Sequence, residues 1–186
     1  MAKKAIVLLA DGFEDVEAVT PIDYLQRAGI EVTAVSISEN LTVTSKWGGI
    51  KMTADTTLSE LVKKGGSWDA VILPGGMPGS SNLAASKETG SLIKNIAANG
   101  KLVCAICAAP ALVLAPLGIL SGKKFTCYPG MEEKVANGKW SDDRVAVDGN
   151  IITSRGAGTA GEFAIAIIEK LLDKITAEKI ASAVLL

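Results

Sequence analysis

The sequence predicts an α/β fold in which helices cover both faces of a doubly wound parallel sheet. Short runs of Val, Ile and Leu without polar alternation recur along the chain, as is typical of strands that a parallel sheet buries on both faces. Longer helical stretches separate these runs, and this alternating order winds a chain into such a sheet. The 186 residues fit one core, so we expect residues 1–186 to fold as a single domain.

Each element is predicted from an apolar run or from the signals that stop a helix. Glycine and asparagine accommodate the left-handed backbone conformation that ends many helices, and both predicted helices run into such residues. The helices are Asp15–Arg27, closed by Gly29, and Ser86–Ala98, closed by Asn99 and Gly100. The strands are Ala5–Ala10, Glu31–Ile37, Ala70–Leu73 and Leu102–Ile106. The chain from Thr159 onward is also predicted to be helical.

Two segments break this alternation, and each is predicted to form an added β-hairpin. Leu41–Ala54 has paired glycines at its middle, and Arg144–Ser154 has an Asp-Gly turn between two apolar runs. Trp47 stands beside the first turn, where a large aromatic side chain is exposed unless something covers it. The indole is expected either to fold back on the sheet or to contact another subunit.

Charge and hydropathy limit the partners that the protein is expected to bind and the cellular compartment in which it is expected. Lysine and arginine total 19 against 20 Asp and Glu, so the net charge of -1 offers no global field for nucleic acid or a membrane surface. The longest apolar stretch, residues 105–120, contains Pro110 and Pro116 and is shorter than the ~18 to 20 residues of a membrane helix. The N-terminal apolar run ends at Asp11 without a cleavage site, so we expect a first strand and a cytoplasmic protein.

The chain contains no histidine, and this absence excludes several kinds of active site. Histidine is the commonest general base and metal ligand, so a Cys-His dyad, a Ser-His-Asp triad and a histidine zinc site cannot form from this sequence. Three scattered cysteines suggest neither a disulfide framework nor a good metal cage. We therefore expect free thiols in a reducing compartment, no metal and no cofactor.

Cys107 is the strongest candidate for chemistry. Open parallel sheets bind ligands at the carboxyl ends of their strands, and Cys107 directly follows the strand predicted over Leu102–Ile106. The small residues after it and Pro110 allow a helix to start at once, which leaves the sulfur beside free amides and the positive end of the helix dipole. We expect this environment to hold the thiol pKa well below its ordinary ~8.5. The local sequence alone fits a small buried hydrophobe equally well.

Three further patterns carry weaker signals. Cys104 and Cys107 spell C-x-x-C, but three steps along a strand separate their Cα atoms by ~10 Å, beyond the ~7 Å of a disulfide, so Cys104 is expected in the core. Cys127 is expected to be buried, with a resolving thiol as the alternative. Residues 156–161 spell G-x-G-x-x-G, yet no strand follows them. These glycines are therefore interpreted as close packing around Arg155 rather than an NAD site.

Glu17 is the carboxylate expected beside Cys107, because its helix begins at the sheet edge where the cysteine strand ends. An ionised carboxylate there would raise the thiol pKa, whereas a protonated Glu17 donates a hydrogen bond to a thiolate. Glu14 and Asp15 are interpreted as solvated residues favourable to the helix dipole, and that interpretation also remains open for Glu17.

Four segments together resemble the ThiJ/PfpI superfamily, and in particular its branch with the Parkinson-disease-associated deglycase and its bacterial homologues. The segments are residues 11–17, the Pro-Gly-Gly at 74–76, residues 105–110 and residues 153–159, and the resemblance covers essentially the whole chain. It implies a flavodoxin-like homodimer with Cys107 as nucleophile and a protonated Glu17 against it. The implied substrate-binding backbone amides are those of Gly75, Gly76 and Ala108, and the implied pocket border is Glu14, Arg27, Tyr128 and Arg155.

The activities of this family are described as varied. Members act as cofactor-free glyoxalases on methylglyoxal, as deglycases of early glycation adducts, as redox-responsive chaperones in oxidative stress and, in one branch, as peptidases. That branch has histidine after the nucleophile where this chain has Ala108, which argues against proteolysis. Human-type members have histidine at the position of Tyr128, so this chain cannot use a mechanism that requires that imidazole. The resemblance implies a glyoxalase III-like or deglycase-like enzyme for small α-oxoaldehydes, with redox sensing through oxidation of Cys107 as the alternative.

Overall fold

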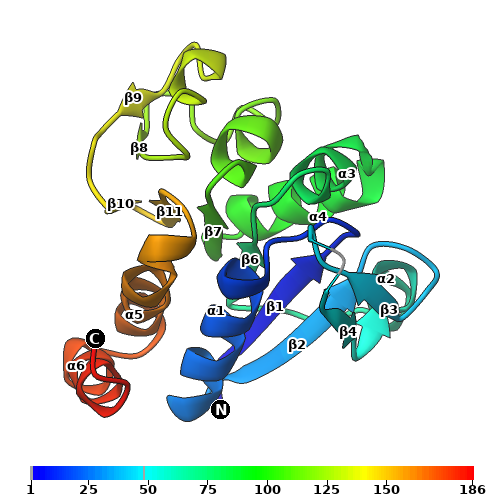
Figure 1. The fold of residues 1–186 in the computed structure, drawn as a ribbon, viewed down its shortest axis with the longest axis horizontal. Helices are drawn as coiled ribbons and strands as arrows, with labels where there is room; N and C mark the ends of the chain where they lie inside the picture. The colour runs from blue at the N-terminus through cyan, green and yellow to red at the C-terminus, as the bar shows by residue number, and fades with distance from the viewer. Residues whose placement is uncertain (1, 48) are drawn as a thin grey trace.

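A computed structural model of the chain, which describes residues 2–47 and 49–186, confirms the predicted α/β fold (Figure 1). Seven strands form the central sheet in the order β10-β11-β7-β6-β1-β2-β5. Each neighbouring pair is parallel except β10 and β11, which are antiparallel. The strands of this sheet are β1 (Lys4–Leu9), β2 (Glu31–Ser36), β5 (Thr56–Thr57), β6 (Ala70–Leu73), β7 (Leu102–Ile106), β10 (Val145–Asp148) and β11 (Ile151–Ser154).

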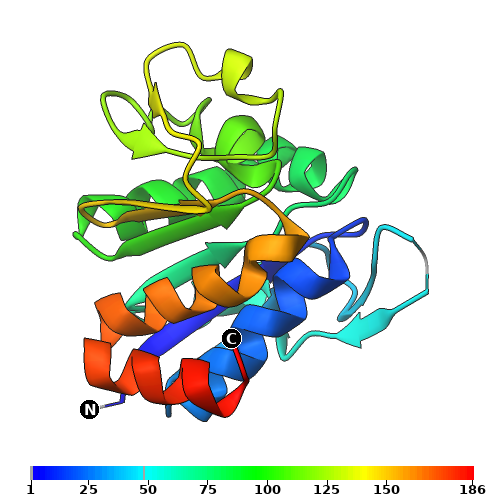
Figure 2. The same cartoon turned by 60° about the vertical axis from the view of Figure 1, so that its left-hand side comes forward.

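Helices cover both faces of the sheet, and each face has its own core (Figure 2). Because successive side chains of a strand point to opposite faces, Val7 and Leu9 of β1 join one core while Ile6 and Leu8 join the other. This double burial is why the strands appear in the sequence as continuous apolar runs. The first face carries α1 (Asp15–Arg27), α5 (Ala160–Leu171) and α6 (Lys174–Ala183), and the second carries α2 (Leu58–Lys64), α3 (Gly79–Ala85), α4 (Lys87–Ala98) and the π-helical turn η1 (Pro110–Leu114).

Both predicted hairpins are present. β3 (Thr42–Thr44) and β4 (Lys51–Thr53) form a separate antiparallel pair, and β10 with β11 forms the antiparallel edge of the central sheet. Gly48, one of the paired glycines of the first predicted hairpin, lies outside the described residues. Trp47 is 76% exposed, with Lys46 Nζ 4.6 Å from its ring centroid. The indole therefore does not fold back on the sheet, and a subunit contact stays a prediction.

The segment after β7 departs from the regular helix that the sequence predicts. The Ala115 N–H donates to the Pro110 carbonyl at 3.0 Å, and this bond between residues five apart makes the turn π-helical. Pro110 has no N–H, and Pro116 removes a second donor just beyond the turn, so an unbroken α-helical ladder cannot run through the segment. Most residues over 105–114 are nevertheless buried.

The structure also contains short elements that the sequence did not predict. The helix α2 carries a local start signal, since the Thr57 side chain accepts a hydrogen bond from the Glu60 N–H at 3.2 Å. The remaining short elements are the parallel pair β8 (Lys124–Phe125) and β9 (Lys139–Trp140) and the 3-10 turns η2 (Glu132–Lys134) and η3 (Ala157–Thr159).

No helix in the described ranges is both long enough and apolar enough to span a membrane.

Candidate active site

The loops that follow β1, β6 and β7 meet at the carboxyl edge of the sheet. These strands are neighbours in the order β7-β6-β1, so the residues after them come together. The Glu14 N–H donates to the Gly75 carbonyl at 3.0 Å, and the Gly79 N–H donates to the Gly12 carbonyl at 3.2 Å. The start of α1 is thereby tied to the loop after β6 through backbone bonds.

Cys107 is held on a tight turn directly after β7. Its φ of 64° lies in the left-handed region, which costs a residue with a Cβ roughly 1 kcal/mol. The Cys107 N–H donates to the Ser154 carbonyl at 2.9 Å, and the Cys107 carbonyl accepts from the Tyr128 N–H at 2.8 Å. Two long-range backbone bonds therefore fix the conformation that presents the sulfur.

Glu17 lies in the first turn of α1 and is only 1% exposed. The Glu14 side chain caps this helix by accepting a hydrogen bond from the Glu17 N–H at 2.8 Å. Glu17 Oε2 accepts a hydrogen bond from the Gly75 N–H at 2.8 Å, and the carboxyl also forms a hydrogen bond with the Cys107 thiol. The structure thus brings the predicted cysteine and carboxylate together.

Gly75 and Gly76 permit the close approach of these groups. A Cβ on Gly75 would lie 2.5 Å from both the Cys107 Cβ and Glu17 Oε2. Gly76 has a φ of +92°, and a Cβ there would lie 2.5 Å from a backbone carbonyl oxygen. The N–H groups of Gly76 and Ala108 contact the sulfur, whereas the Gly75 N–H is taken by Glu17. Two of the three amides expected at the reacting oxygen therefore surround the sulfur, and the third holds the carboxyl.

The electrostatics of Glu17 are dominated by burial. Its pKa is raised from 4.5 to about 7, mainly by burial and further by the charge of Glu14. Hydrogen bonds from Cys107 and Gly75, and the positive charge of Lys46, act in the opposite direction. Near neutral pH the carboxyl is therefore balanced between its protonated and ionised forms.

The expectation of a low pKa for Cys107 is wrong while Glu17 is ionised. Burial raises the pKa of the thiol to about 12, and the charge and hydrogen bond of Glu17 add to this effect. The amides of Gly76 and Ala108 lower it, but by less. The sequence indicates these amides, but it does not reveal that the sulfur is buried, and burial has the larger effect on the thiol pKa. When Glu17 holds the proton its charge no longer opposes the thiolate, and its O–H can donate a hydrogen bond that favours the thiolate.

Cys107 differs from the other two cysteines in its access to solvent. All three thiols are free, Cys104 and Cys127 are buried, and Cys107 is partly exposed. Burial of Cys104 in the core is as predicted, and burial raises its pKa above the ordinary range. Burial raises the pKa of Cys127 to about 12, and the charge of Glu132 contributes in the same direction.

Three of the four residues expected at the pocket border lie near the pair. Glu14 caps α1 directly beside Glu17. Tyr128 is 53% exposed, and its backbone is bonded to Cys107. Arg155 directly follows Ser154, the residue whose carbonyl holds the Cys107 N–H. The Arg155 guanidinium forms an ion pair with a neighbouring aspartate rather than with either member of the pair.

The fourth expected border residue lies elsewhere. Arg27 occupies the last turn of α1, about 15 Å along the helix axis from Glu17. Its Nε donates to Asp23 Oδ2 at 2.8 Å instead. The sequence analysis also did not place two residues near Glu17: the charge of Lys46 lowers its pKa, and Gly156 lies so close that a Cβ there would be 3.8 Å from its Oε1. Both come from loops whose approach depends on the tertiary fold, although the G-x-G-x-x-G pattern had already marked Gly156.

Residues 2–47 and 49–186 contain no group of three His, Cys, Asp or Glu side chains that could hold a metal ion. The groups that the structure brings together at Cys107 are one thiol, one carboxyl and several oriented amides. A cysteine presented on a left-handed turn after a central parallel strand, against a buried glutamate from the first helix, defines a class of α/β proteins. Residues 3–170 match the DJ-1/PfpI family, and the chain belongs to that family.

Relatives and solved structures place the chain within this family. It is 40% identical over 187 residues to Protein dj-1beta of Drosophila melanogaster, covering 100% of this chain and 98% of the relative. The crystal structure of Drosophila melanogaster DJ-1beta superposes with a TM-score of 0.94 at 39% identity, covering 100% of this chain and 99% of that one. A Caenorhabditis elegans relative named Glutathione-independent glyoxalase DJR-1.2 is 36% identical over 91% of this chain and 89% of its own.

Some relatives are much longer than this chain. Protein DJ-1 homolog B of Arabidopsis thaliana is 42% identical over 180 residues, which are 96% of this chain and 40% of the relative. A second Arabidopsis relative, Protein DJ-1 homolog A, is matched over 47% of its length. The chain thus spans less than half of these two plant proteins.

Proposed function

We propose that the chain is a cofactor-free, glyoxalase-like enzyme that converts small α-oxoaldehydes such as methylglyoxal and glyoxal to hydroxy acids. The observation that carries this proposal is the hydrogen-bonded contact of the Cys107 thiol with a buried Glu17 whose pKa is about 7. The glyoxalase name of the Caenorhabditis elegans relative supports the same class of substrate. Early glycation adducts, which contain the same carbonyl chemistry, are a second substrate class for this site.

The proposed first step is addition of the Cys107 sulfur to the aldehyde carbon. The S–C bond forms, the π electrons of the C=O bond move to oxygen, and that oxygen takes up a proton to give a hemithioacetal. The amides of Gly76 and Ala108, which contact the sulfur, lie where they can also meet the developing oxyanion. The reaction thus begins without a metal or a second thiol.

Glu17 then moves one proton within the bound intermediate. Its carboxylate removes the proton from the former aldehyde carbon and returns it to the neighbouring carbonyl carbon. The hydroxyl proton of the hemithioacetal passes to the neighbouring carbonyl oxygen in the same rearrangement, which gives a thioester of the hydroxy acid. Water cleaves the S–C bond, releases lactate from methylglyoxal and restores the thiol. A carboxyl with a pKa of about 7 suits both directions of transfer, because it gains and loses a proton with equal ease near neutral pH.

The test is enzymatic assay of D- and L-lactate formed from methylglyoxal by the purified protein without metal or glutathione. We expect slow turnover, because one carboxyl serves as both acid and base. Cys107→Ser should abolish turnover, whereas the matched Cys104→Ser should retain it, since Cys104 lies in the core. Product equal to a blank without protein, or undiminished in Cys107→Ser, would overturn the proposal.

Redox sensing is the second candidate function, supported by the partial exposure of Cys107 and the raised pKa of Glu17. One peroxide would convert the thiol to a sulfenic acid and release water, and a second would give the sulfinic acid. A protonated Glu17 would donate a hydrogen bond to the oxidised sulfur. Mass spectrometry after peroxide treatment should then give different products for the parent and Glu17→Leu, and identical products would rule this role out.

We also propose that the chain is a cytoplasmic homodimer. The exposed Val16 and Val19 of α1 and the 94% exposed Leu185 are apolar side chains that a second copy could cover. Light scattering at several concentrations would give the mass in solution. A monomer at all concentrations would contradict the dimer.

A further inference from the structure

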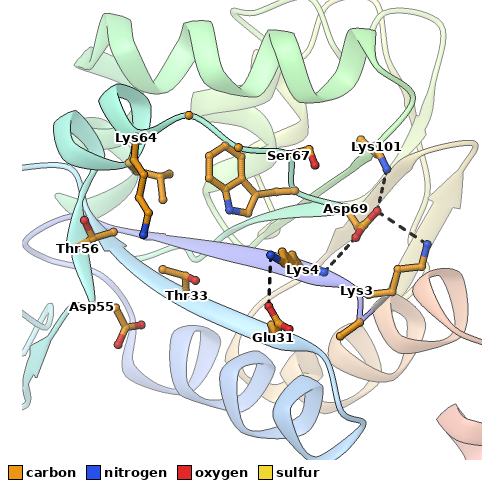
Figure 3. A pocket seen from close by; sticks show the side chains of 15 residues that line it. Lys3, Lys4, Glu31, Thr33, Asp55, Thr56, Lys64, Ser67, Asp69 and Lys101 are labelled. Atoms are coloured by element: carbon orange, nitrogen blue, oxygen red, sulfur yellow. Dashed lines mark hydrogen bonds and ion pairs between the residues drawn. The ribbon is translucent and has the colours of Figure 1, made fainter.

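A cavity of about 730 Å³ opens at the amino edge of the sheet, and Figure 3 shows its lining side chains. Cys107 lies at the opposite, carboxyl edge. Small-molecule sites commonly have volumes of ~300 to 1,000 Å³. Lys101, which lines this cavity, precedes β7, and Cys107 follows the same strand. The two residues are therefore about 20 Å apart along the strand, so the cavity is separate from the active site. The amino-edge pocket is defined here by Lys4, Glu31, Lys64, Trp68, Asp69 and Lys101.

The ionic groups of the amino-edge pocket are arranged around one carboxylate. Asp69 Oδ1 lies 2.8 Å from Lys101 Nζ and 3.8 Å from Lys3 Nζ, and Asp69 Oδ2 accepts from the Lys4 N–H at 3.0 Å. Burial acts to raise the pKa of Asp69, but the hydrogen bonds from Lys101 and the Lys4 amide outweigh it and lower the pKa. Asp69 thus stays ionised and serves two ammonium groups at once. Glu31 lies 3.6 Å from Lys4 Nζ.

Lys64 also lines the pocket, but it takes no part in these ion pairs. It lies in the last turn of α2, and within the described part of the chain it forms no ion pair. Figure 3 shows its side chain extending across the pocket in the direction of Thr33. Asp55, the remaining carboxylate of the lining, accepts a hydrogen bond from the Ala34 N–H at 2.8 Å. The lining therefore has one more ammonium group than carboxylate groups, and among the described residues Lys64 is the lining lysine without a carboxylate partner.

Trp68 supplies an aromatic surface to the same pocket. Its side chain is partly buried against the core that α2 and α4 share, and it also lines the cavity. Gly66 lies close to this ring, since a Cβ there would be 3.4 Å from two atoms of the six-membered ring. In the described residues the indole N–H has no hydrogen-bond partner. An aromatic ring with an unpaired donor thus lines the same pocket as a lysine without an ion pair.

We propose that the amino-edge pocket binds a small planar aromatic anion, with its ring against Trp68 and its anionic group at Lys64. A divalent cation is a poor fit, because the carboxylates are already paired with lysines or a backbone amide. A polyanion is also a poor fit, because only one positive charge is in excess. Aromatic carboxylates and mononucleotides share the required chemistry, a flat ring and one anionic end.

The test uses NMR of the indole N–H signals, of which Trp68 contributes one and Trp47 and Trp140 the others. Phenylacetate is the first probe, phenethyl alcohol is the neutral control with the same ring, and adenosine monophosphate represents nucleotides. We expect phenylacetate or adenosine monophosphate to shift the Trp68 signal saturably and phenethyl alcohol to shift it much less. Tighter binding of the nucleotide would identify that source, and tighter binding of phenylacetate would identify an aromatic acid.

Two lysines at the end of α2 give a matched pair of variants. Lys64→Ala should weaken binding of the anionic probe by about tenfold, the usual loss for one charge-assisted hydrogen bond. Lys63→Ala should leave it within about twofold, because Lys63 is equally exposed but does not line the pocket. The proposal is overturned by any of three results: no saturable shift up to about 10 mM of either anion, equal shifts from the neutral probe, or equal binding by the two variants.

Discussion

The two edges of the central sheet are built in opposite ways. At the carboxyl edge, backbone bonds hold Cys107, and the carboxyl of Glu17 is buried between a glycine loop and the sulfur. At the amino edge, lysine side chains surround a roomy cavity and are held mainly by one partly exposed carboxylate, Asp69. A large cavity therefore does not locate the chemistry in this molecule; strained backbone and a buried titratable pair do. The same contrast predicts that substitutions at the carboxyl edge have the larger effects.

The largest effect is expected from Gly75→Ala. The added methyl group would lie 2.5 Å from both the Cys107 Cβ and Glu17 Oε2, and neither can move away without breaking backbone bonds. We expect loss of about 100-fold or more in lactate formation and destabilisation by about 1 to 3 kcal/mol. Gly158→Ala is the control, because no atom lies within 4 Å of a Cβ there. Equal activity of the two variants would show that the pair does not depend on this close approach.

The next effect concerns the pH dependence of stability. Because the pKa of Glu17 is raised from 4.5 to about 7, the folded protein binds this proton more tightly than the unfolded chain does. The free energy of unfolding should therefore fall by about 3 kcal/mol from this group as the pH rises from about 4.5 to about 7. Glu17→Gln should remove that slope in denaturant titrations. A slope equal to the parent would mean that Glu17 titrates normally.

The smallest effect is expected at the amino edge. Asp69→Asn removes the charge that Lys3 and Lys101 share, and pairs this exposed contribute at most about 1 kcal/mol to the free energy of unfolding. Added salt should reduce the difference between parent and variant. Lactate formation should stay unchanged, since the active site lies at the other end of the strands. A loss of turnover comparable to that of Gly75→Ala would contradict the expectation that substitutions at the carboxyl edge have the larger effects.

The sequence predicted much of the fold because the signals for its long elements are local. The helix Asp15–Arg27 and the strands Ala70–Leu73 and Leu102–Ile106 have the predicted bounds, since apolar runs and stop residues mark them. The π-helical turn after Cys107 and the short helix Gly79–Ala85 were not predicted. Short elements depend on tertiary contacts more than on their own periodicity, so their sequences carry little signal.

The site was predictable to the extent that sheet topology places residues. Glu17 and Cys107 follow β1 and β7, the two strands on either side of β6, and the structure brings them together at one edge. Arg27 is not a border residue, because it lies in the last turn of α1, about 15 Å along the helix axis from Glu17. Lys46 was missed because a hairpin delivers it from a distant part of the chain. The thiol pKa was misjudged because burial of the sulfur cannot be seen in a linear motif.

Whether Glu17 takes up the proton of Cys107 is tested most directly by ultraviolet titration of the thiolate. Cys104→Ala combined with Cys127→Ala leaves Cys107 as the sole thiol of the chain. We expect thiolate absorbance to rise in a step centred no higher than about pH 7, because that is where the pair loses its first proton. Adding Glu17→Leu should move the step above ~8.5, since burial then acts on an unassisted thiol. Absence of thiolate until the pH approaches 12 in the protein with Glu17 would show that the carboxyl keeps the negative charge, and would contradict a reactive sulfur at neutral pH.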